Sequence, residues 1–256
     1  MKKHTAGKNS SSWWEEIIYK KMEDKKMAKK AEAKVLEVLS VDLAEVEITI
    51  VGRTPLIVHR WSEKAKREML EKQMGVAKKR KHEIKIPTND FIGSLNWLTP
   101  MPELGADDAE AMENFDEAIR KGARFGFHIG GIKQSFITGA YRSGMDVKQT
   151  ELRGSFFLRG KGEYSNTDYA EIITKNPPRM REDTVMVGGM SKSADLRYRG
   201  QFDEWEIPLI LQYNKNGKYS LEQLLNIVNA GGFAVGIGEW RPEKDGQYGM
   251  YYLKLQ

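Results

Sequence analysis

The stretch that decides the fold lies near the end of the chain: WEIPLILQY at Trp205–Tyr213, SLEQLLNIVN at Ser220–Asn229 and YGMYYLKL at Tyr248–Leu255. The first and last blocks are short, apolar and rich in β-formers, which is typical of strands. Asn216-Gly217 between the first two blocks is a hairpin-type turn signal. Ser220 and Gln223 form a capping-box pattern that opens a helix over Leu221–Asn229, and Gly231 stands where a C-terminal cap glycine belongs. This stretch predicts strand, helix, strand.

The first half of the chain predicts a matching unit. Val46, Ile48 and Ile50 alternate with polar residues as in a strand that carries on toward Pro55, where Leu56–Val58 continues it. Further helices are expected from a Ser62 cap to about Gln73, over Ala106–Lys121 and over Ile132–Arg142, and further strands at Leu152–Leu158, Thr184–Val187 and Asp195–Arg199. With residues 59–124 set aside as a large helical insertion, the order is βαββαβ. We therefore predict an α+β, ferredoxin-like antiparallel sheet with two helices on one face.

Composition limits the class of protein. The 256 residues include no cysteine, which excludes disulfides and thiolate metal sites. No apolar run reaches the 18 residues of a membrane span, and no signal peptide is visible, so we expect no membrane partner and a cytoplasmic location, in a bacterial host cell if a phage encodes the protein.

The positive charge is concentrated at the N-terminus. Residues 1–34 hold ten lysines against five acids, and because the whole chain has a net charge of +5, the remainder is formally neutral. We treat residues 1–45 as a basic N-terminal arm, helical over Trp13–Glu37, and residues 46–256 as the folded domain. The arm is either a solvated extension or a polyelectrolyte segment that reaches for phosphates or a neighbouring subunit.

A glycine cluster precedes the last strand. The segment GGFAVGIGEWRPEKDGQYG at 231–249 holds six glycines, which weaken helix and strand alike. One interpretation is a turn-rich connection packed under the final strand. The other is a backbone platform for a phosphate–ribose chain, with Gly236 and Gly238 in the loop and Trp240 and Arg241 offering a stacking ring and a cation. The segment is not a nucleotide P-loop, because the Gly-Lys-Ser/Thr ending is missing.

At these residues the chain resembles the RAMP superfamily, which includes backbone subunits and crRNA-processing ribonucleases of CRISPR effector complexes. The glycine-rich loop before the last strand looks like that family's signature, VGRTPL at 51–56 is similar to its first strand, and IGGIKQSFITGAYR at 129–142 is similar to its first helix. The family's helix proline is missing here, and Lys133 stands earlier than the family lysine. These matches cover about 45 of the 256 residues. The resemblance implies an RNA- or single-strand-binding surface and, in backbone subunits, head-to-tail assembly.

Basic and aromatic residues alternate elsewhere. Arg197 and Arg199 flank Tyr198 and would share one face of a strand, where they either contact phosphates or pair with acids, namely Asp195, Glu204 or Glu206. Residues 64–85 hold nine Lys/Arg against three acids, which is either a solvated face or a nucleic-acid clamp. The expected nucleic-acid-binding residues are Arg60, Lys133, Arg142, Arg197, Arg199, Gly236, Gly238, Trp240 and Arg241.

The histidines are the only weak catalytic candidates. His59 and His128 each stand in a connection between elements, where either would serve as a general base. A structural role is the simpler interpretation of both. The four histidines are far apart in sequence and no carboxylate pattern has metal-ligand spacing, so we expect no metal and no cofactor.

Three functions follow, in order of preference. The first is non-catalytic binding of RNA or single-stranded DNA by a homo-oligomer or a subunit of a larger complex. The second is a metal-independent endoribonuclease that uses His59 or His128. The third is a protein-interaction module, such as a phage or mobile-element factor that acts on a host complex.

Overall fold

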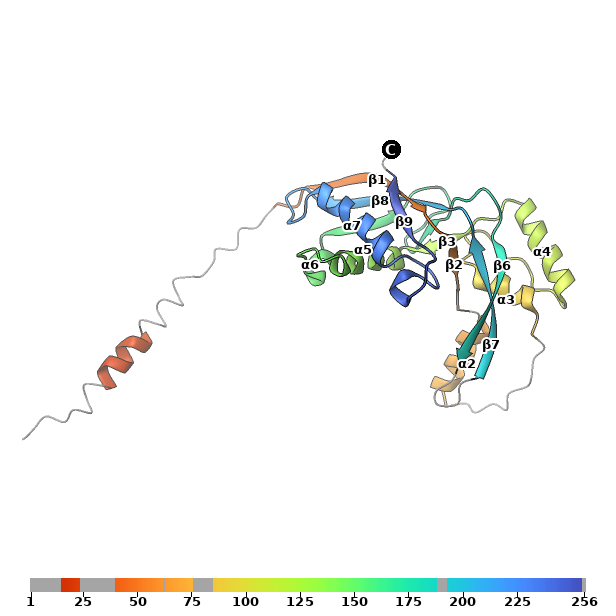
Figure 1. Cartoon of the computed structure of the whole chain (residues 1–256), viewed down its shortest axis with the longest axis horizontal. Helices are drawn as coiled ribbons and strands as arrows, with labels where there is room; N and C mark the ends of the chain where they lie inside the picture. The colour runs from red at the N-terminus through yellow and green to blue at the C-terminus, as the bar shows by residue number, and fades with distance from the viewer. Residues whose placement is uncertain (1–14, 24–39, 62, 76–84, 188–192, 255–256) are drawn as a thin grey trace, which may run out of the picture. The chain divides into compact units, whose positions relative to one another are not determined.

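The computed structural model describes residues 15–23, 40–61, 63–75, 85–187 and 193–254 (Figure 1), without the side chains of 63–65, 68 and 187. Contacts divide the chain into two units, Met1–Ser40 and Val41–Gln256. In the first unit, residues 15–23 form a helix, while Trp13, Trp14 and residues 24–37 of the predicted arm helix lie outside the described residues. All elements named below belong to the second unit.

The central sheet has four antiparallel strands in the order β4-β8-β1-β9. They are β1 (Leu43–Gly52), β4 (Phe156–Gly160), β8 (Glu206–Asn214) and β9 (Tyr251–Lys254). Helix α5 (Ile129–Arg142) lies between β1 and β4 in the chain, and α7 (Leu221–Ala234) lies between β8 and β9. The four strands therefore follow a βαββαβ path with the spatial order second, third, first, fourth. This is the ferredoxin-like topology, so the predicted fold class is confirmed.

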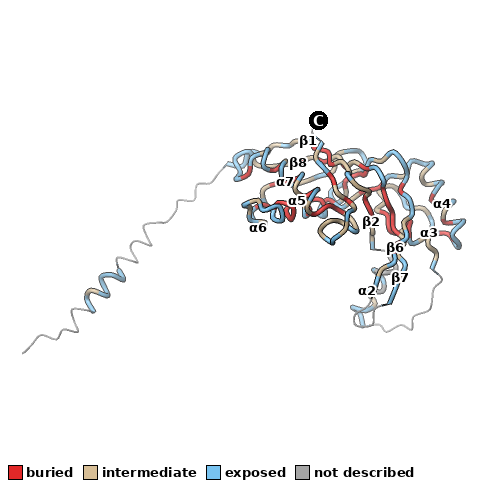
Figure 2. Tube along the Cα trace, in the orientation of Figure 1, coloured by how far each residue is buried: buried red, intermediate tan, exposed pale blue. Residues whose placement is uncertain are grey.

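The core lies between this sheet and its two helices. On β8, Ile207, Leu209 and Leu211 are fully buried in one cluster with Ile132 of α5 and Ile227 of α7. Each buried aliphatic side chain of this kind stabilises the fold by about 1.5–3 kcal/mol. Figure 2 shows the buried positions gathered along the central sheet and the two helices. The alternation of apolar and polar residues along the strands thus determines which face of the sheet α5 and α7 cover.

The first insertion, between β1 and α5, contains β2 (Leu56–Val58), α2 (Glu63–Gln73), α3 (Pro87–Ser94), α4 (Asp108–Arg120) and β3 (Gly126–His128). The α4 helix begins at Asp107, whose side chain accepts a hydrogen bond from the Glu110 N–H, as expected for an N-cap. The predicted Ser62 cap and most of the basic run at 78–85 lie outside the described residues.

The second insertion, between β4 and β8, contains β5 (Tyr169–Glu171), β6 (Arg179–Val187) and β7 (Ser193–Phe202). Strand β7 pairs with both β2 and β6 in a second sheet, and β5 pairs with β3. Leu56–Val58 therefore joins this second sheet. The prediction that these residues continue β1 is wrong. At the break between β1 and β2, the Trp205 indole Nε1–H donates to the Thr54 carbonyl at 2.9 Å.

Two predicted boundaries are wrong. Residues at Leu152–Leu158 do not form one strand: α6 (Gln149–Arg153) ends first, because burying Leu152 against the core favours a helical turn there, and β4 begins at Phe156. The capping box at Ser220 is confirmed, but α7 runs through Gly231 to Ala234. The cap glycine is Gly236, which has φ +69° and donates its N–H to the Gly231 carbonyl at 2.9 Å.

Among the described residues, no helix is long and apolar enough to cross a membrane.

Candidate nucleic-acid interface

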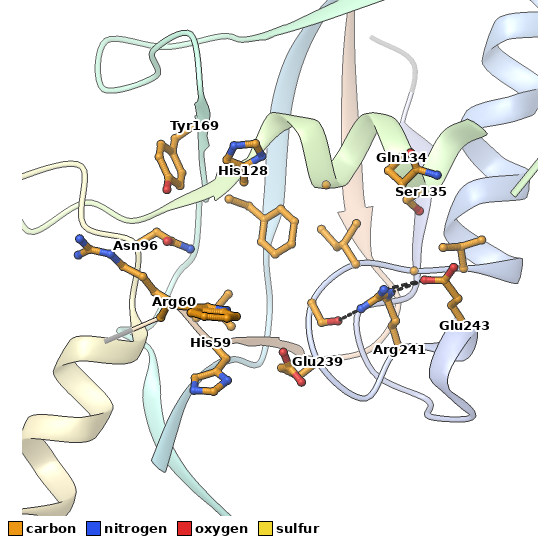
Figure 3. Close-up of a pocket in the computed structure, with 18 of the residues that line it drawn as sticks. His59, Arg60, Asn96, His128, Gln134, Ser135, Tyr169, Glu239, Arg241 and Glu243 are labelled. Carbon is orange, nitrogen blue, oxygen red and sulfur yellow. Dashed lines mark hydrogen bonds and ion pairs between the residues drawn. The ribbon is translucent and has the colours of Figure 1, made fainter. Parts of the chain in front are cut away.

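A cavity of about 470 Å³ opens where the two insertions meet the central fold. Its lining comes from the end of β2 and the residues after it, from β3 and the start of α5, from β5 and from the glycine loop: Val58–Trp61, Phe127, His128, Gly131, Gln134, Ser135, Tyr169, Val235–Glu239, Arg241 and Glu243. Figure 3 shows Arg60 and Asn96 on one side of the cavity and Arg241 and Glu243 on the other. Lys66 of α2 also lines it. We refer to this space as the cavity.

The N-terminus of α5 forms one wall of the cavity. Its first-turn N–H groups have no acceptor within the helix, and no side chain caps them. The Ile129 N–H donates to the Asp168 carbonyl at 2.8 Å, and Gly131 of the first turn lines the cavity. A Cβ at Gly130 would lie 2.8 Å from Cε1 of His128, so glycine lets this ring lie against the helix end. Such a terminus favours an approaching anion.

The two histidine candidates both line the cavity. His59 is half-buried, and burial lowers its pKa below the usual 6.5, with a further decrease from the nearby Arg199 that Glu239 partly opposes. At neutral pH the His59 imidazole is therefore uncharged. His128 packs edge-on against Tyr169, with ring centroids 5.5 Å apart. The sequence shows no partner near either histidine, but the fold brings both to the same cavity.

The cation Arg241 lines the cavity in an ion pair. Its Nε and Nη2 donate to Glu243 at 3.0 and 2.6 Å, and Nη1 donates to the Gly238 carbonyl at 3.0 Å. Arg142 of α5 lies 3.7 Å from the other oxygen of Glu243. Two predicted cations therefore share one carboxylate, so this corner keeps a net positive charge.

The glycine loop is packed largely against the chain's own backbone. A Cβ at Gly249 would lie 1.8 Å from the Ile237 carbonyl oxygen, and one at Gly246 would lie 1.7 Å from that of Trp240. Gly238 has φ +79°, and a Cβ there would lie 2.3 Å from the Ile57 carbonyl oxygen. Close internal packing thus explains most glycines of this segment. Only Gly236 and Gly238 of the cluster line the cavity.

The arginines of β7 are paired with acids. Arg197 Nε donates to Asp195 at 2.8 Å, and Arg199 Nη1 donates to Asp183 at 2.9 Å. Arg199 is buried, so its guanidinium belongs to the protein interior and we do not carry it into the proposed interface. The alternative of pairing with nearby acids describes both arginines, although the main partner of Arg199 is Asp183, which sequence analysis did not name.

Lys133 also points away from the cavity. Its ammonium donates to the Arg153 carbonyl at 2.8 Å and lies 4.4 Å from the ring centre of Phe157. Burial and the charge of Arg153 lower the pKa of Lys133.

The uncovered face of the central sheet carries cross-strand ion pairs. Arg159 of β4 lies 2.6 Å from Glu45 of β1, and Lys161 pairs with Glu47. These pairs leave little net positive charge for a phosphate chain, which makes the cavity the better candidate for the interface.

Several cavity residues were missed by sequence analysis. Asn96, Phe127 and Tyr169 belong to no motif, and Gln134, Ser135 and Glu239 lie inside quoted motifs without having been singled out; only the tertiary structure brings the six together. Of the predicted set, Arg60, Gly236, Gly238, Arg241 and both histidines line the cavity, while Lys133, Arg142, Arg197, Arg199 and Trp240 do not. Among the described residues, no group of three or more His, Asp or Glu side chains is arranged to hold a metal ion.

No protein-family model matches the chain, and no curated protein matches it. Among solved structures, the chain is similar to the crystal structure of Cmr6 from Pyrococcus furiosus, with a TM-score of 0.30 and 11% identity, over 83% of this chain and 99% of that one. We draw no conclusion from a likeness at this level, and the fold rests on the strand order and helix placement described above.

Proposed function

We propose that the protein binds RNA or single-stranded DNA, without cleaving it, and that the cavity is the binding site. The observation that supports this is the convergence in one cavity of cations, aromatic rings and a helix N-terminus from segments far apart in the chain. Arg60, Lys66 and Arg241 supply positive charge, and Glu239 and Glu243 offset part of it. Trp61 is 57% exposed and offers a ring at the rim.

These groups suit the two parts of a nucleotide. A phosphate is attracted to the cations and to the first turn of α5, while a base stacks on a ring without regard to sequence. A volume of about 470 Å³ lies within the range of small-molecule sites, and it suits one nucleotide of a strand. The proposal therefore predicts binding with little base preference and strong salt dependence.

The salt dependence of binding tests this proposal. A labelled single-stranded oligonucleotide, in ribose and deoxyribose forms, is titrated by anisotropy between about 50 and 200 mM salt. Three cations contribute a slope of about 2 in log affinity against log salt, at about 0.7 per contact. Arg60→Gln lowers this slope by about 0.7.

Arg179→Gln is the matched control for this titration, because Arg179 pairs with Asp203 at 2.9 Å and does not line the cavity. Equal losses in Arg60→Gln and Arg179→Gln contradict the cavity as the site. Absence of binding by the wild-type protein contradicts the function itself and favours the protein-interaction alternative.

A second candidate is metal-independent cleavage of RNA, favoured by the presence of both histidines around one cavity. Cleavage by attack of the 2′-hydroxyl needs a base and an acid, and two imidazoles are able to divide these roles. The nuclease would cut RNA but not DNA in the presence of EDTA, and would lose activity in His59→Gln or His128→Gln. Intact RNA after prolonged incubation rejects it.

We extend the proposal to membership of the RAMP superfamily and to assembly as a homo-oligomer or as a subunit of a larger complex. Its support is the ferredoxin-like topology with a glycine loop between the second helix and the last strand. Mass measurement of the purified protein, alone and with an oligonucleotide, tests the assembly.

A further inference from the structure

Trp240 has an unusual backbone conformation beside the cavity. Its φ is +52°, in the left-handed region that bulky residues rarely adopt. Its neighbours Glu239 and Arg241 both line the cavity, whereas Trp240 does not, and 40% of Trp240 is exposed. Strained residues of this kind persist only where surrounding contacts hold them, and they occur often at functional sites.

The Asp183 carboxylate of β6 lies beside the Trp240 side chain. The Asp183 carboxylate is buried and also accepts from Arg181 Nε at 2.8 Å and from Arg199 Nη1 at 2.9 Å. The backbone of Trp240 is fixed as well, because its carbonyl accepts from the Tyr248 N–H at 3.0 Å. Trp240 therefore has an anchored backbone, and a buried carboxylate lies beside its side chain.

The same cluster ties the β6–β7 hairpin to the glycine loop. Arg181 Nη1 donates to the Tyr248 hydroxyl at 3.0 Å, and its guanidinium lies 4.6 Å from the centre of that ring. Arg199 Nη2 lies 3.8 Å from Glu239 in the cavity lining. Side chains of the hairpin thus contact the glycine loop at Tyr248 and at Glu239, the residue before Trp240.

Another tryptophan of the chain shows what a purely structural role looks like. Trp205 is only 3% exposed, and its indole N–H donates to a backbone carbonyl. Trp240 instead lies beside a buried carboxylate and keeps 40% of its surface in solvent. Such an arrangement costs hydrophobic burial and conformational strain, and core packing does not require it.

We propose that Trp240, positioned by Asp183, is a second stacking subsite that binds the nucleobase next to the one held in the cavity. The inference rests on the proposed function and adds the length of its ligand: a strand of at least two nucleotides. Asp183 is a positioning residue, since it acts on the ligand only through the Trp240 ring.

A length series of adenylates tests this subsite. Dissociation constants are measured for adenylate mono-, di- and tetranucleotides, in ribose and deoxyribose forms. The wild-type protein gains affinity from one nucleotide to two, and Trp240→Leu loses about tenfold on the longer ligands with little change for the mononucleotide, as expected when one base–ring stack is removed.

Asp183→Asn tests the positioning role. It gives a loss no larger than that of Trp240→Leu, and the double variant is no weaker than Trp240→Leu alone. In the Trp61→Phe background, an oligonucleotide quenches tryptophan fluorescence, and Trp240→Leu removes part of this quenching. Asp183→Asn removes the same part. Trp240→Phe keeps a ring but lacks the indole N–H, so it gives an intermediate loss of affinity. This variant leaves the ion cluster intact, so it tests the positioning role even if Asp183→Asn does not fold.

The outcomes separate the two proposals. If the gain from one nucleotide to two is the same in the wild type and in Trp240→Leu, the subsite is wrong while the cavity remains the binding site. If losses in Asp183→Asn and Trp240→Leu add, the positioning role is wrong. If the wild-type protein binds none of the adenylates, both the proposed function and the subsite are wrong.

Discussion

Gly139 of α5 and Gly231 of α7 meet where the two helices cross: a Cβ on Gly139 would lie 2.3 Å from Cα of Gly231. A neighbouring contact is also close, since a Cβ on Gly231 would lie 3.0 Å from Cα of Phe136. Because the backbones of the two helices are in close contact, the start of α5 and the glycine loop after α7 both lie at the cavity. The crossing thus sets the geometry of the candidate interface.

Gly139→Ala is expected to destabilise the protein by about 1–3 kcal/mol, because the methyl group meets backbone that cannot move without separating the helices. Urea unfolding measures the change. Gly93→Ala in α3 is the matched control, since nothing lies within 4 Å of its added Cβ, and alanine in a helix is favoured over glycine by up to about 1 kcal/mol. Equal effects at both sites contradict the crossing.

Ser135→Ala is expected to cost more than Tyr251→Phe. The two hydroxyls lie 2.8 Å apart, and Tyr251 is 1% exposed, so burial raises the pKa of its hydroxyl and keeps it protonated. Tyr251→Phe leaves Ser135 its other partner, the Gly231 carbonyl at 3.2 Å, and costs about 1 kcal/mol, while Ser135→Ala leaves the buried Tyr251 hydroxyl without its partner, at about 1–3 kcal/mol. In urea unfolding, the double variant loses less stability than the sum of the two single losses. Additive losses exclude the hydrogen bond between the two hydroxyls.

Glu243→Gln is expected to strengthen nucleic-acid binding. Its carboxylate pairs with Arg241 and Arg142, so its removal leaves both guanidinium groups for phosphate. One like charge fewer near the ligand corresponds to roughly 1 kcal/mol, or about fivefold in affinity, in low salt. Anisotropy titration measures this, with exposed Glu113→Gln of α4 as control. Weaker or unchanged binding in Glu243→Gln places the strand elsewhere.

His59 is expected to make stability depend on pH. Its pKa in the folded protein is lowered by burial and by Arg199, so the unfolded chain binds a proton first as pH falls. The free energy of unfolding therefore decreases as pH falls below 6.5 and levels off below the folded-state pKa. Urea unfolding across this range measures the decrease. His59→Asn removes this component, and an unchanged pH profile in that variant contradicts the assignment.

The fold followed from local patterns because those patterns act within a few residues. The capping box at Ser220 and the alternation along Val46–Ile50 decide helix and strand without help from distant parts of the chain. By contrast, the end of α7 was misplaced, because Gly231 serves a contact with α5 that lies 92 positions away at Gly139. A cap glycine and a packing glycine look the same in sequence.

The site was predictable only in part. His59, Arg60 and Arg241 were singled out from local context and line one cavity, but their acidic partners and the aromatic residues around them were not. Whether a cation faces a ligand or an acid depends on which strands become neighbours. Arg199 pairs with Asp183 across the β6–β7 hairpin, and Glu243 meets Arg142 from another helix.

The amino-acid sequence by itself determined the α+β class, the βαββαβ order and the presence of a glycine loop before the last strand, since periodicity and capping are short-range effects. Tertiary structure alone decided which of these residues surround a cavity, which cations are neutralised and how Trp240 is held. The physical reason is that side-chain pairing and close backbone packing depend on distances between segments far apart in the chain, which only the folded arrangement of the sheets sets.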